Sequence, residues 1–592
     1  MRYAQTFILL TVLLLHPSLA QCNKAVFRVH PSTRTVSAVA AAMSDMLVGT
    51  TGGLLIVNDE GKRLLLAGIP IRQIISDGAT GAYIATDYGL YHWDESVLSK
   101  LWDKPVTSVI VKNRCLLLGS LAGRIVKWYR GITKDFAKLP SQSPVHSLVE
   151  DDGKLRAATV QGMWIYNNGV FEEEKLSDEL LHQTITVLKT LGGRLFAGTP
   201  DGLFENLQKQ WIRLGRGKTR ACHVNDIAKD EKGIIYIATA GDGVLKLRNR
   251  RLRTIRKSTK FVTALTVFED KLYLGTLVQG LLLHGKSASQ LFSFEEEPPG
   301  NAITSLAYAN ETNTLVVGTF DNGVGLAKGS EWTHYRAENG NLSSNWVSHV
   351  ASGGKGVLLR HSDGSVYCQY SGDYFRKLGV KDGWPKEWTS SIGTCGWRSW
   401  AGTYSAFFLR SANSWKTVAP KPTLHGNIVL DVELLDKEAW VATHRNGLYR
   451  WDALANEWRQ YTLGSGMTDT WVTCVEEFQG EIWAGTFAGG LCRLRGTEEE
   501  RSLHPNDYLK KSNWQHYLKN RGVNCLVVTE DELWIGTQKG LIRWDGSEFS
   551  EFGLEDGLPS STIWAITSDG QNLWIGTDVG LCSASLETLR RF

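Results

Sequence analysis

Cysteine is scarce in this chain and does not cluster. Nine cysteines are spread over 592 residues, and no two of them stand in a C-x-x-C spacing. That spacing is the usual sign of a zinc site or a redox pair, so neither is indicated. Most of the cysteines are expected to be buried free thiols. Cys474 and Cys525 occupy equivalent positions in consecutive repeats, and a disulfide between them is left open.

A charge excess and long apolar runs are also missing. The formal net charge is only +4, which gives no reason to expect a nucleic acid or an anionic membrane as the main partner. After the first twenty residues no run reaches the roughly 18 apolar residues that cross a bilayer, so no membrane insertion is expected. Residues 1–20 combine Arg2, an apolar stretch and Ser18-Leu19-Ala20, the pattern of a cleaved signal peptide. We therefore expect an exported protein, periplasmic or secreted.

Familiar catalytic motifs are lacking too. The sequence contains no Gly-x-Ser-x-Gly elbow and no HExxH segment, so serine hydrolase and zinc protease chemistry are not indicated. No cofactor and no metal are expected. Asp321 and Asp469 are weak candidates for acid–base hydrolysis, which requires two suitably spaced carboxyl groups.

The chain is rich in one repeated phrase: an apolar pair, a small residue, Thr, two variable positions, Gly and an aliphatic residue. It reads Val48-Gly49-Thr50 with Gly53-Leu54 near the start, and Ile575-Gly576-Thr577 with Gly580-Leu581 near the end. Fourteen copies recur at a period of about forty residues, which indicates one supersecondary unit copied many times.

Each copy predicts four short strands. In the last complete copies these are residues 563–566 and 572–576, with 541–544 and 547–552 as the third and fourth strands of the preceding copy. Turn signals such as Asp545-Gly546 separate them. Four-stranded antiparallel units of this size cannot bury both faces alone, so they close into a ring. The predicted fold class is all-β, a β-propeller.

Fourteen blades exceed the four to eight of an ordinary propeller, whereas two seven-bladed propellers in tandem fit. The charged, proline-containing stretch 295–300 is the best linker. We therefore expect a first propeller over 21–298 and a second over 299–592. The last copy stops after its third strand, at 581–585. Residues 25–30 look like an unpaired outer strand that could close this blade.

The wording of the repeat resembles the two-component regulator propeller repeat, whose copies read approximately Leu-Pro-Ser-Asn-x-Val, Asp-x-x-Gly-x-Leu-Trp-Ile-Gly-Thr and Gly-Leu. The matching residues are Gly557-Leu558-Pro559-Ser560-Ser561, Ile563, Asp569-Gly570 and Leu573-Trp574-Ile575-Gly576-Thr577. Copy nine departs, with Leu359-Arg360-His361 in place of the small residue and Thr. The resemblance implies the paired propellers of a periplasmic sensor that recognises oligosaccharides. No kinase or β-sandwich stands within these 592 residues, so we expect capture rather than signalling.

The residue just before each innermost strand should lie at the mouth of the ring. In the second ring three of these residues are tryptophans: Trp346, Trp388 and Trp471. Flat aromatic faces stack on sugar rings while neighbouring polar groups form hydrogen bonds. The polar companions are Asn345, Glu387, Arg445, Asp469 and Asn524. The competing interpretation is that the three indoles fill space between blades, as Trp534 and Trp574 of the repeat motif are expected to do.

A basic run occupies one copy of the first ring and spans its third and fourth strands: Lys246, Arg248, Arg250, Arg251, Arg253, Arg256 and Lys257. It is either a solvated edge that discourages strand-to-strand association or an attraction for an acidic glycan or partner.

Three functions stay open. The leading hypothesis is an exported binding protein for a carbohydrate or a similar extracellular ligand. The second is a scaffold for another protein, and the third is a glycan-cleaving enzyme with its site between the two propellers.

Overall fold

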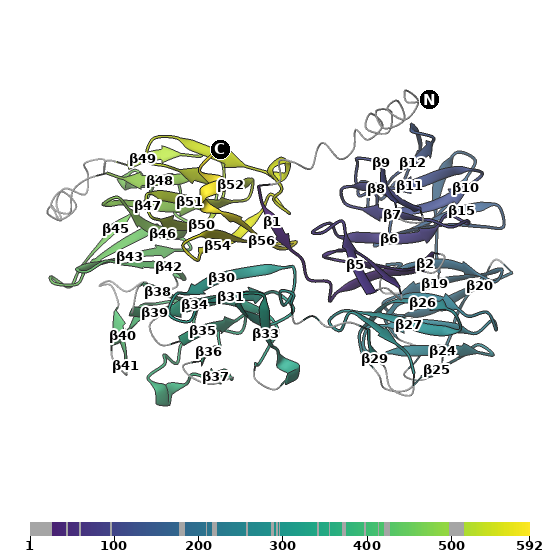
Figure 1. Cartoon of the computed structure of the whole chain (residues 1–592), viewed down its shortest axis with the longest axis horizontal. Helices are drawn as coiled ribbons and strands as arrows, with labels where there is room; N and C mark the ends of the chain where they lie inside the picture. The colour runs from purple at the N-terminus through teal and green to yellow at the C-terminus, as the bar shows by residue number, and fades with distance from the viewer. Residues whose placement is uncertain are drawn as a thin grey trace, which may run out of the picture. The chain divides into compact units, whose positions relative to one another are not determined.

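The computed structural model of the chain is built almost entirely from β-strands (Figure 1), which form fourteen four-stranded sheets over the described residues. This confirms the predicted all-β class and the fourteen blades. The structure describes residues 26–592 except 43–44, 59–60, 95–96, 177–183, 209, 216–218, 220–221, 256–258, 286–288, 292–293, 295, 340–341, 354–355, 370–373, 396–397, 412–413, 419–426 and 496–513. The predicted signal peptide lies outside this range. Among the described residues, no helix has the length and apolar character that a membrane crossing requires.

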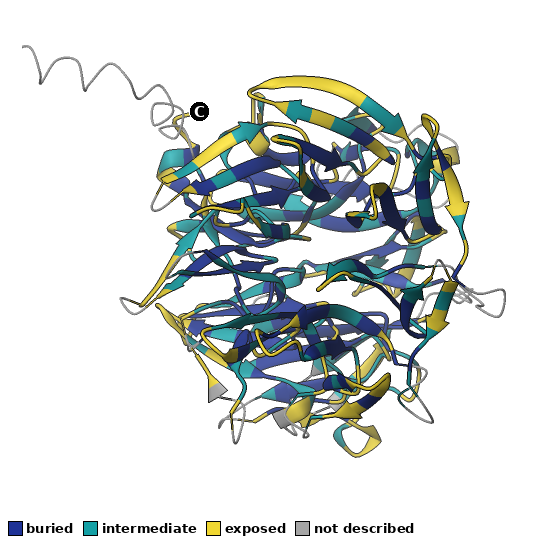
Figure 2. Cartoon of the chain, turned by 90° about the vertical axis from the view of Figure 1, so that its right-hand side faces the viewer, coloured by how far each residue is buried: buried dark blue, intermediate teal, exposed yellow. Residues whose placement is uncertain are grey.

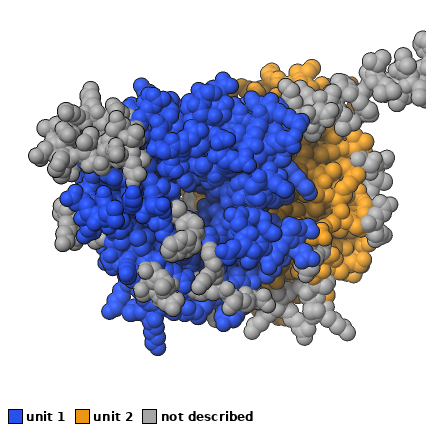
Figure 3. Space-filling model, turned by 60° about the vertical axis from the view of Figure 1, so that its left-hand side comes forward, with its two compact units in different colours: residues 1–30, 301–592 blue, residues 31–300 orange. Residues whose placement is uncertain are grey.

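The chain divides into two compact units (Figure 3). One unit comprises Pro31–Gly300 and contains seven sheets, which we call the first propeller, blades 1 to 7. The other comprises the described residues up to His30 together with Asn301–Phe592, and we call it the second propeller, blades 8 to 14.

Each blade of the first propeller contains four consecutive strands. In chain order the bounds are β2 (Val36–Ala42), β3 (Asp45–Thr50), β4 (Gly53–Asn58), β5 (Gly61–Leu65); β6 (Ile71–Ser76), β7 (Ala82–Thr86), β8 (Gly89–Asp94), β9 (Val97–Trp102); β10 (Ser108–Lys112), β11 (Cys115–Gly119), β12 (Arg124–Tyr129), β13 (Ile132–Lys138); β14 (Ser147–Asp151), β15 (Lys154–Thr159), β16 (Gly162–Asn167), β17 (Val170–Glu174); β18 (Val187–Leu191), β19 (Arg194–Thr199), β20 (Gly202–Leu207), β21 (Gln210–Arg213); β22 (Val224–Lys229), β23 (Ile235–Thr239), β24 (Val244–Arg248), β25 (Arg251–Thr254); β26 (Val262–Phe268), β27 (Lys271–Thr276), β28 (Leu281–Leu283) and β29 (Ser289–Gln290).

The second propeller follows the same order up to its last blade. Its bounds are β30 (Ile303–Ala309), β31 (Thr314–Thr319), β32 (Val324–Lys328), β33 (Glu331–Tyr335); β34 (Val347–Gly353), β35 (Gly356–His361), β36 (Val366–Gln369), β37 (Arg376–Lys377); β38 (Ser391–Cys395), β39 (Arg398–Gly402), β40 (Phe407–Ser411), β41 (Ser414–Val418); β42 (Val429–Leu434), β43 (Glu438–Thr443), β44 (Leu448–Asp452), β45 (Glu457–Tyr461); β46 (Val472–Phe478), β47 (Glu481–Thr486), β48 (Leu491–Leu494), β49 (Trp514–Tyr517); β50 (Val523–Thr529), β51 (Glu532–Thr537), β52 (Gly540–Trp544), β53 (Phe549–Phe552); β54 (Ile563–Ser568), β55 (Asn572–Thr577) and β56 (Leu581–Ser585). Short helices are η2 (Ala337–Asn339), η3 (Val380–Asp382), η4 (Leu463–Ser465), η6 (Leu554–Asp556) and α3 (Leu586–Leu589).

The last blade takes its fourth strand from the start of the chain. Strand β1 (Arg28–His30) pairs antiparallel with β56, and the purple β1 lies beside the yellow β56 in Figure 1. Phe27, just before β1, is buried in the core of this blade, and its ring meets Phe552 edge to face at 5.9 Å. The imidazole of His30 forms a hydrogen bond of 2.8 Å with the hydroxyl of Ser583.

The Thr and Gly of the repeat form a closed turn between the second and third strands of a blade. The buried hydroxyl of Thr577 donates to the carbonyl of Gly580 at 2.8 Å and accepts the N–H of Val579. The small residue before Thr allows the neighbouring blade to pack closely. A methyl group at Gly576 would stand 2.5 Å from Ile303 of the adjacent inner strand, so this position keeps neighbouring blades in close contact.

Inner strands are joined side to side around each propeller. Thr263 of blade 7 donates to the carbonyl of Val36 of blade 1 at 2.6 Å, which closes the first ring. In the second propeller, Ile303 of blade 8 shares a buried cluster with Ala565 and Leu581 of blade 14. Buried residues concentrate on the second strand of each blade, as in β31 and β43, and exposed ones on loops and outer strands (Figure 2).

The cysteines that the structure describes are free thiols, and Cys474 and Cys525 are among them. The disulfide left open by the sequence is therefore not formed. Cys474 lies against Gly485 of its own blade and Cys525 against Gly536, so each thiol fills space beside the small residue of the repeat.

Candidate ligand-binding site

Two loop positions of each blade meet at one end of the second propeller. The first precedes the inner strand, and the second follows the Thr that ends the next strand. The N–H of Phe487 donates to the carbonyl of Trp471 at 3.0 Å, and that of Gln538 to Gly522 at 3.1 Å. We call the end of the second propeller that carries these loops its mouth.

Aromatic side chains occupy these positions in five consecutive blades, 8 to 12. We call them the aromatic collar, which consists of Phe320, Trp346, Trp388, Tyr404, His444, Trp471 and Phe487. The three tryptophans predicted from the sequence belong to it. Blades 13 and 14 have no aromatic residue at the equivalent positions, so the collar covers only part of the rim.

Phe320 and Trp346 form the most open pair of the collar. Their ring centroids lie 4.6 Å apart, and the residues are 51% and 42% exposed. They come from neighbouring blades, because Phe320 follows β31 and Trp346 precedes β34. Their rings are therefore accessible to a ligand at the mouth.

The indole of Trp388 is packed against two side chains of the same propeller, Arg360 and Tyr404. The guanidinium carbon of Arg360 lies 4.5 Å from the centre of the indole, and the ring of Tyr404 stacks on it with centroids 5.1 Å apart. The indole also lies against Gly364, where a Cβ atom would stand only 2.4 Å from it, so position 364 has no room for a side chain. Tyr404 itself is 43% exposed, so in this pair the tyrosine is the outer ring.

Trp471 is covered in the same way. Phe487 stacks almost parallel on it, with centroids 4.0 Å apart and an angle of 10° between the planes. His444 approaches with centroids 4.2 Å apart at 72°. Burial lowers the pKa of His444, and the nearby Arg445 lowers it further, which keeps the imidazole neutral near pH 7. Phe487 is 43% exposed.

The collar thus has an inner layer and an outer layer. Trp388 and Trp471 support the outer rings of Tyr404 and Phe487, while Trp346 stands open beside Phe320. Sequence reasoning missed Phe320, Tyr404 and Phe487. The available signal was their shared position immediately after the Gly-Thr or equivalent pair of the repeat.

Three of the predicted polar companions are engaged in local structure. Asn345 accepts the N–H of Ala337 and donates to Glu338, both at 2.9 Å. Asp469 accepts the N–H groups of Trp471 and Ala488 at 3.0 Å each. The side-chain amide of Asn524 donates a hydrogen bond of 2.8 Å to the carbonyl of Ile563 in the next blade. These side chains shape the mouth and join its blades.

The other two companions are more accessible. Glu387 is exposed and accepts the hydroxyl of Ser405 at 2.8 Å, beside Tyr404. Arg445 is exposed, and its backbone N–H donates to Asn427 at 3.2 Å. An acidic group therefore stands close to Tyr404 and a basic group next to His444, and each has hydrogen-bonding capacity for a polar ligand.

Asp321, a weak catalytic candidate from the sequence, follows Phe320 directly. Burial raises the pKa of its carboxyl group above the usual range, and the adjacent Asn322 donates to it at 2.8 Å. The second candidate, Asp469, is already bonded to two backbone N–H groups. Nothing in these contacts pairs the two carboxyl groups with each other.

Carboxyl groups also gather on the inner strands β42 and β46. Asp431 accepts the N–H of Val475 at 3.0 Å, and burial raises its pKa to about 6. Burial raises the pKa of Glu433 to about 7, with repulsion from Asp431 as the next contribution. Burial and these two neighbours raise the pKa of Glu476 well above its usual value. Over the described part of the chain no group of side chains has the arrangement of a metal site.

Comparison with known families supports the resemblance of the repeat to the two-component regulator propeller repeat. The family model described as two component regulator propeller matches residues 557–579, which confirms the resemblance at the last copy. No curated protein matches the chain.

Solved structures share the fold over nearly the whole chain. PorZ, an essential bacterial surface component of the type-IX secretion system of Porphyromonas gingivalis, matches 95% of this chain and 87% of its own, at 14% identity and a TM-score of 0.69. An ancestral GH74 enzyme matches 95% and 99%, at 12% identity and a TM-score of 0.63. The extracellular domain of a putative hybrid two component system from B. thetaiotaomicron matches 95% and 83%, at 16% identity and a TM-score of 0.37. The first two establish similarity of fold alone.

Proposed function

We propose that this chain is an exported binding protein, periplasmic or secreted, that captures a carbohydrate or a similar ring-containing ligand at the mouth of the second propeller. The supporting observation is the outer layer of the aromatic collar. Phe320, Tyr404 and Phe487 present partly exposed rings held in place by neighbouring aromatic groups. Rings fixed in this way lose little side-chain entropy when a ligand stacks on them.

The polar rim fits this proposal. Glu387 stands close to Tyr404 and Arg445 next to His444, and both have hydrogen-bonding capacity for hydroxyl groups. Asn345, Asp469 and Asn524 act indirectly, because they hold the loops that carry Trp346, Trp471 and the adjoining blade. A bound ring would therefore meet aromatic faces from several blades and polar groups between them.

The test uses the full mature chain on a glycan array, followed by calorimetry with the best ligand. Replacing Tyr404 and Phe487 by Ala should weaken binding at least tenfold. The matched control is Phe261→Ala, an exposed aromatic residue that precedes an inner strand of the first propeller. Unchanged affinity in the double variant would remove the mouth from consideration.

A protein partner is the second candidate, because exposed aromatic rings in a rigid setting also anchor protein interfaces. PorZ, which shares the fold, is a surface component of a secretion system. A partner that co-purifies with the native chain, and is lost from the Tyr404→Ala, Phe487→Ala variant while no glycan binds, would favour the scaffold. The fold shared with a GH74 enzyme leaves glycan cleavage as a third outcome, for which product release from a polysaccharide panel is the measure.

A further inference from the structure

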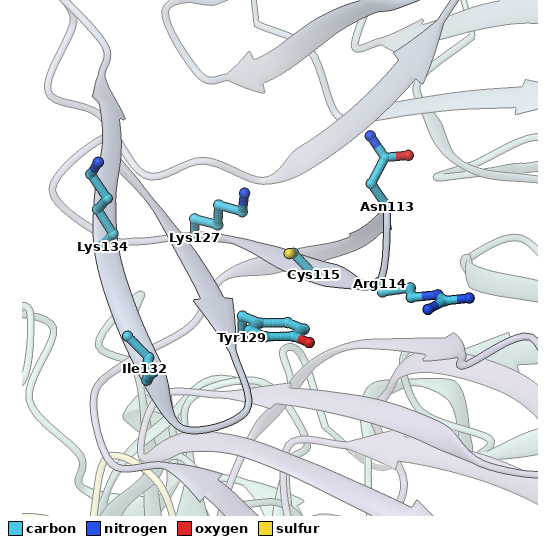
Figure 4. A pocket seen from close by; sticks show the side chains of 7 residues that line it. All are labelled: Asn113, Arg114, Cys115, Lys127, Tyr129, Ile132 and Lys134. Carbon is cyan, nitrogen blue, oxygen red and sulfur yellow. The ribbon is translucent and has the colours of Figure 1, made fainter.

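An open pocket of about 460 Å³ lies on blade 3 of the first propeller (Figure 4). It belongs to neither the mouth nor the acidic strands described above. Its lining comes entirely from β11, β12, β13 and the turn before β11. The side chains that matter are Arg114, Lys127, Tyr129, Ile132 and Lys134, and Figure 4 shows them around the hollow.

Strand register places like charges directly opposite each other here. Lys127 of β12 pairs with Lys134 of β13, and two residues along the strands Tyr129 pairs with Ile132. Residues two apart point to the same face of a sheet. One face of this hairpin therefore carries a cationic row and, about 7 Å along the strand, a row with an aromatic and an aliphatic side chain.

The cationic row has no internal counterion. Within the described residues, Arg114, Lys127 and Lys134 form no ion pair, and no carboxylate lines the pocket. The same blade does neutralise another lysine, because Lys112 lies 2.8 Å from Glu150. Like charges directly opposite in a sheet are destabilising. An anionic ligand between the two lysines would remove this repulsion.

The remaining lining adds a surface for a ring. Tyr129 and Ile132 are exposed, and the guanidinium of Arg130 lies 5.5 Å from the centre of the Tyr129 ring. The turn residues Asn113 and Arg114 both adopt positive φ angles, 49° and 62°, and Asn113 also lines the pocket. Its amide and the Tyr129 hydroxyl offer hydrogen bonds to ring hydroxyl groups.

We propose that this pocket binds an acidic saccharide, a sugar ring that bears a carboxylate or a phosphate. The anionic group lies between Lys127 and Lys134, and the ring packs on Tyr129 and Ile132. The separation of the two rows suits a pyranose with its charged substituent. This site lies in a different propeller from the mouth, and its existence does not depend on the proposed function.

The experiment measures binding to the full mature chain by calorimetry with glucuronate and glucose 6-phosphate as probes. Glucose, inorganic phosphate and AMP are the comparison ligands. At least one acidic sugar should bind, and raising the salt from about 50 to 500 mM should weaken it, because the contact is between charges. The Lys127→Ala, Lys134→Ala variant should lose at least tenfold in affinity.

Two further variants make the result specific. Lys127→Glu creates an opposite-charge pair with Lys134, so it should abolish binding while leaving or raising the melting temperature. Lys138→Ala removes an exposed lysine of β13 outside the pocket lining and should bind normally. Phe487→Ala should also bind normally, which separates this site from the mouth.

Several outcomes would overturn the proposal. They are absence of binding by both acidic sugars, equal binding of glucose, equal binding of inorganic phosphate, and tighter binding of AMP. Undiminished affinity in the double lysine variant would place the binding elsewhere on the chain.

Discussion

The partly buried carboxyl group of Glu433, on the inner strand β42, shows how strongly its surroundings can shift the pKa of a side chain in this molecule. Glu433 stands beside Asp431 and one strand away from Glu476. Burial raises the pKa of all three groups, and like charge raises those of Glu433 and Glu476 further. In the unfolded chain these groups ionise near pH 4. The folded state therefore holds protons that the unfolded state has released, and stability falls as pH rises from about 4 to about 7.

Glu433→Gln removes one of these groups without changing its size. We expect the free energy of unfolding to rise by about 1–2 kcal/mol at pH 8, and the gain to vanish at about pH 3, where the carboxyl group is protonated in both states. Denaturant titrations at the two pH values measure the difference. Glu311→Gln, at an exposed loop position of the same propeller, is the control and should show no such pH dependence. A gain of equal size at both pH values would contradict the argument.

The residues of the repeat were readable from sequence because each has a local task. Thr closes a turn with its own hydroxyl, and the small residue before it admits the neighbouring inner strand. The collar was only partly readable. Trp388 and Trp471 stood at predicted positions, but the stacking of Tyr404 and Phe487 on them depends on which loops meet across a blade. The two positions after Thr vary in the phrase, so the aromatic residues at the first of them could be found only by comparing this position between the copies.

Among the strands, β1 is the one whose partner is farthest away in sequence. The last copy stops one strand short, which predicts that residues 25–30 could complete its blade, and β1 does pair with β56. The register and the burial of Phe27 were not predictable, since they depend on how the chain returns to its own beginning. The acidic cluster has a similar origin, because Asp431 and Glu476 become neighbours only when β42 and β46 stand side by side.

Phe27→Ala tests how much this strand contributes. The side chain is buried against Phe552 and the core of blade 14, and loss of a buried phenylalanine typically costs about 3–5 kcal/mol. We expect the second propeller to unfold at lower denaturant concentration, as followed by tryptophan fluorescence. Arg28→Ala, one residue along and exposed, should stay within about 0.5 kcal/mol of the parent. Equal midpoints for the two variants would show that β1 contributes little.

The two propellers differ in how they are completed. Every strand of the first comes from Pro31–Gly300, and Thr263 joins its last blade to its first. The second needs β1 from outside Asn301–Phe592. The repeat period alone predicts the propeller architecture. The asymmetry between the two propellers depends on the pairing of β1 with β56, which the structure shows.

Residues 31–300 produced alone should therefore fold, elute as a compact monomer and melt cooperatively. Residues 301–592 alone should melt at a lower temperature, because the outer edge of β56 and the cavity left by Phe27 are uncovered. Circular dichroism and size-exclusion chromatography measure both, with the full mature chain as reference. Equal cooperativity and melting temperature of the second fragment and the full chain would contradict this expectation.

Strand β1 also sets an order of events during synthesis. His30 and Ser583, which meet in the finished blade, are 553 positions apart. At translation rates of about 5–20 residues per second, the N-terminal strand waits roughly half a minute to two minutes before its partner exists. The strands of the first propeller all exist before that interval ends, whereas the last blade cannot be completed until β56 has been synthesised.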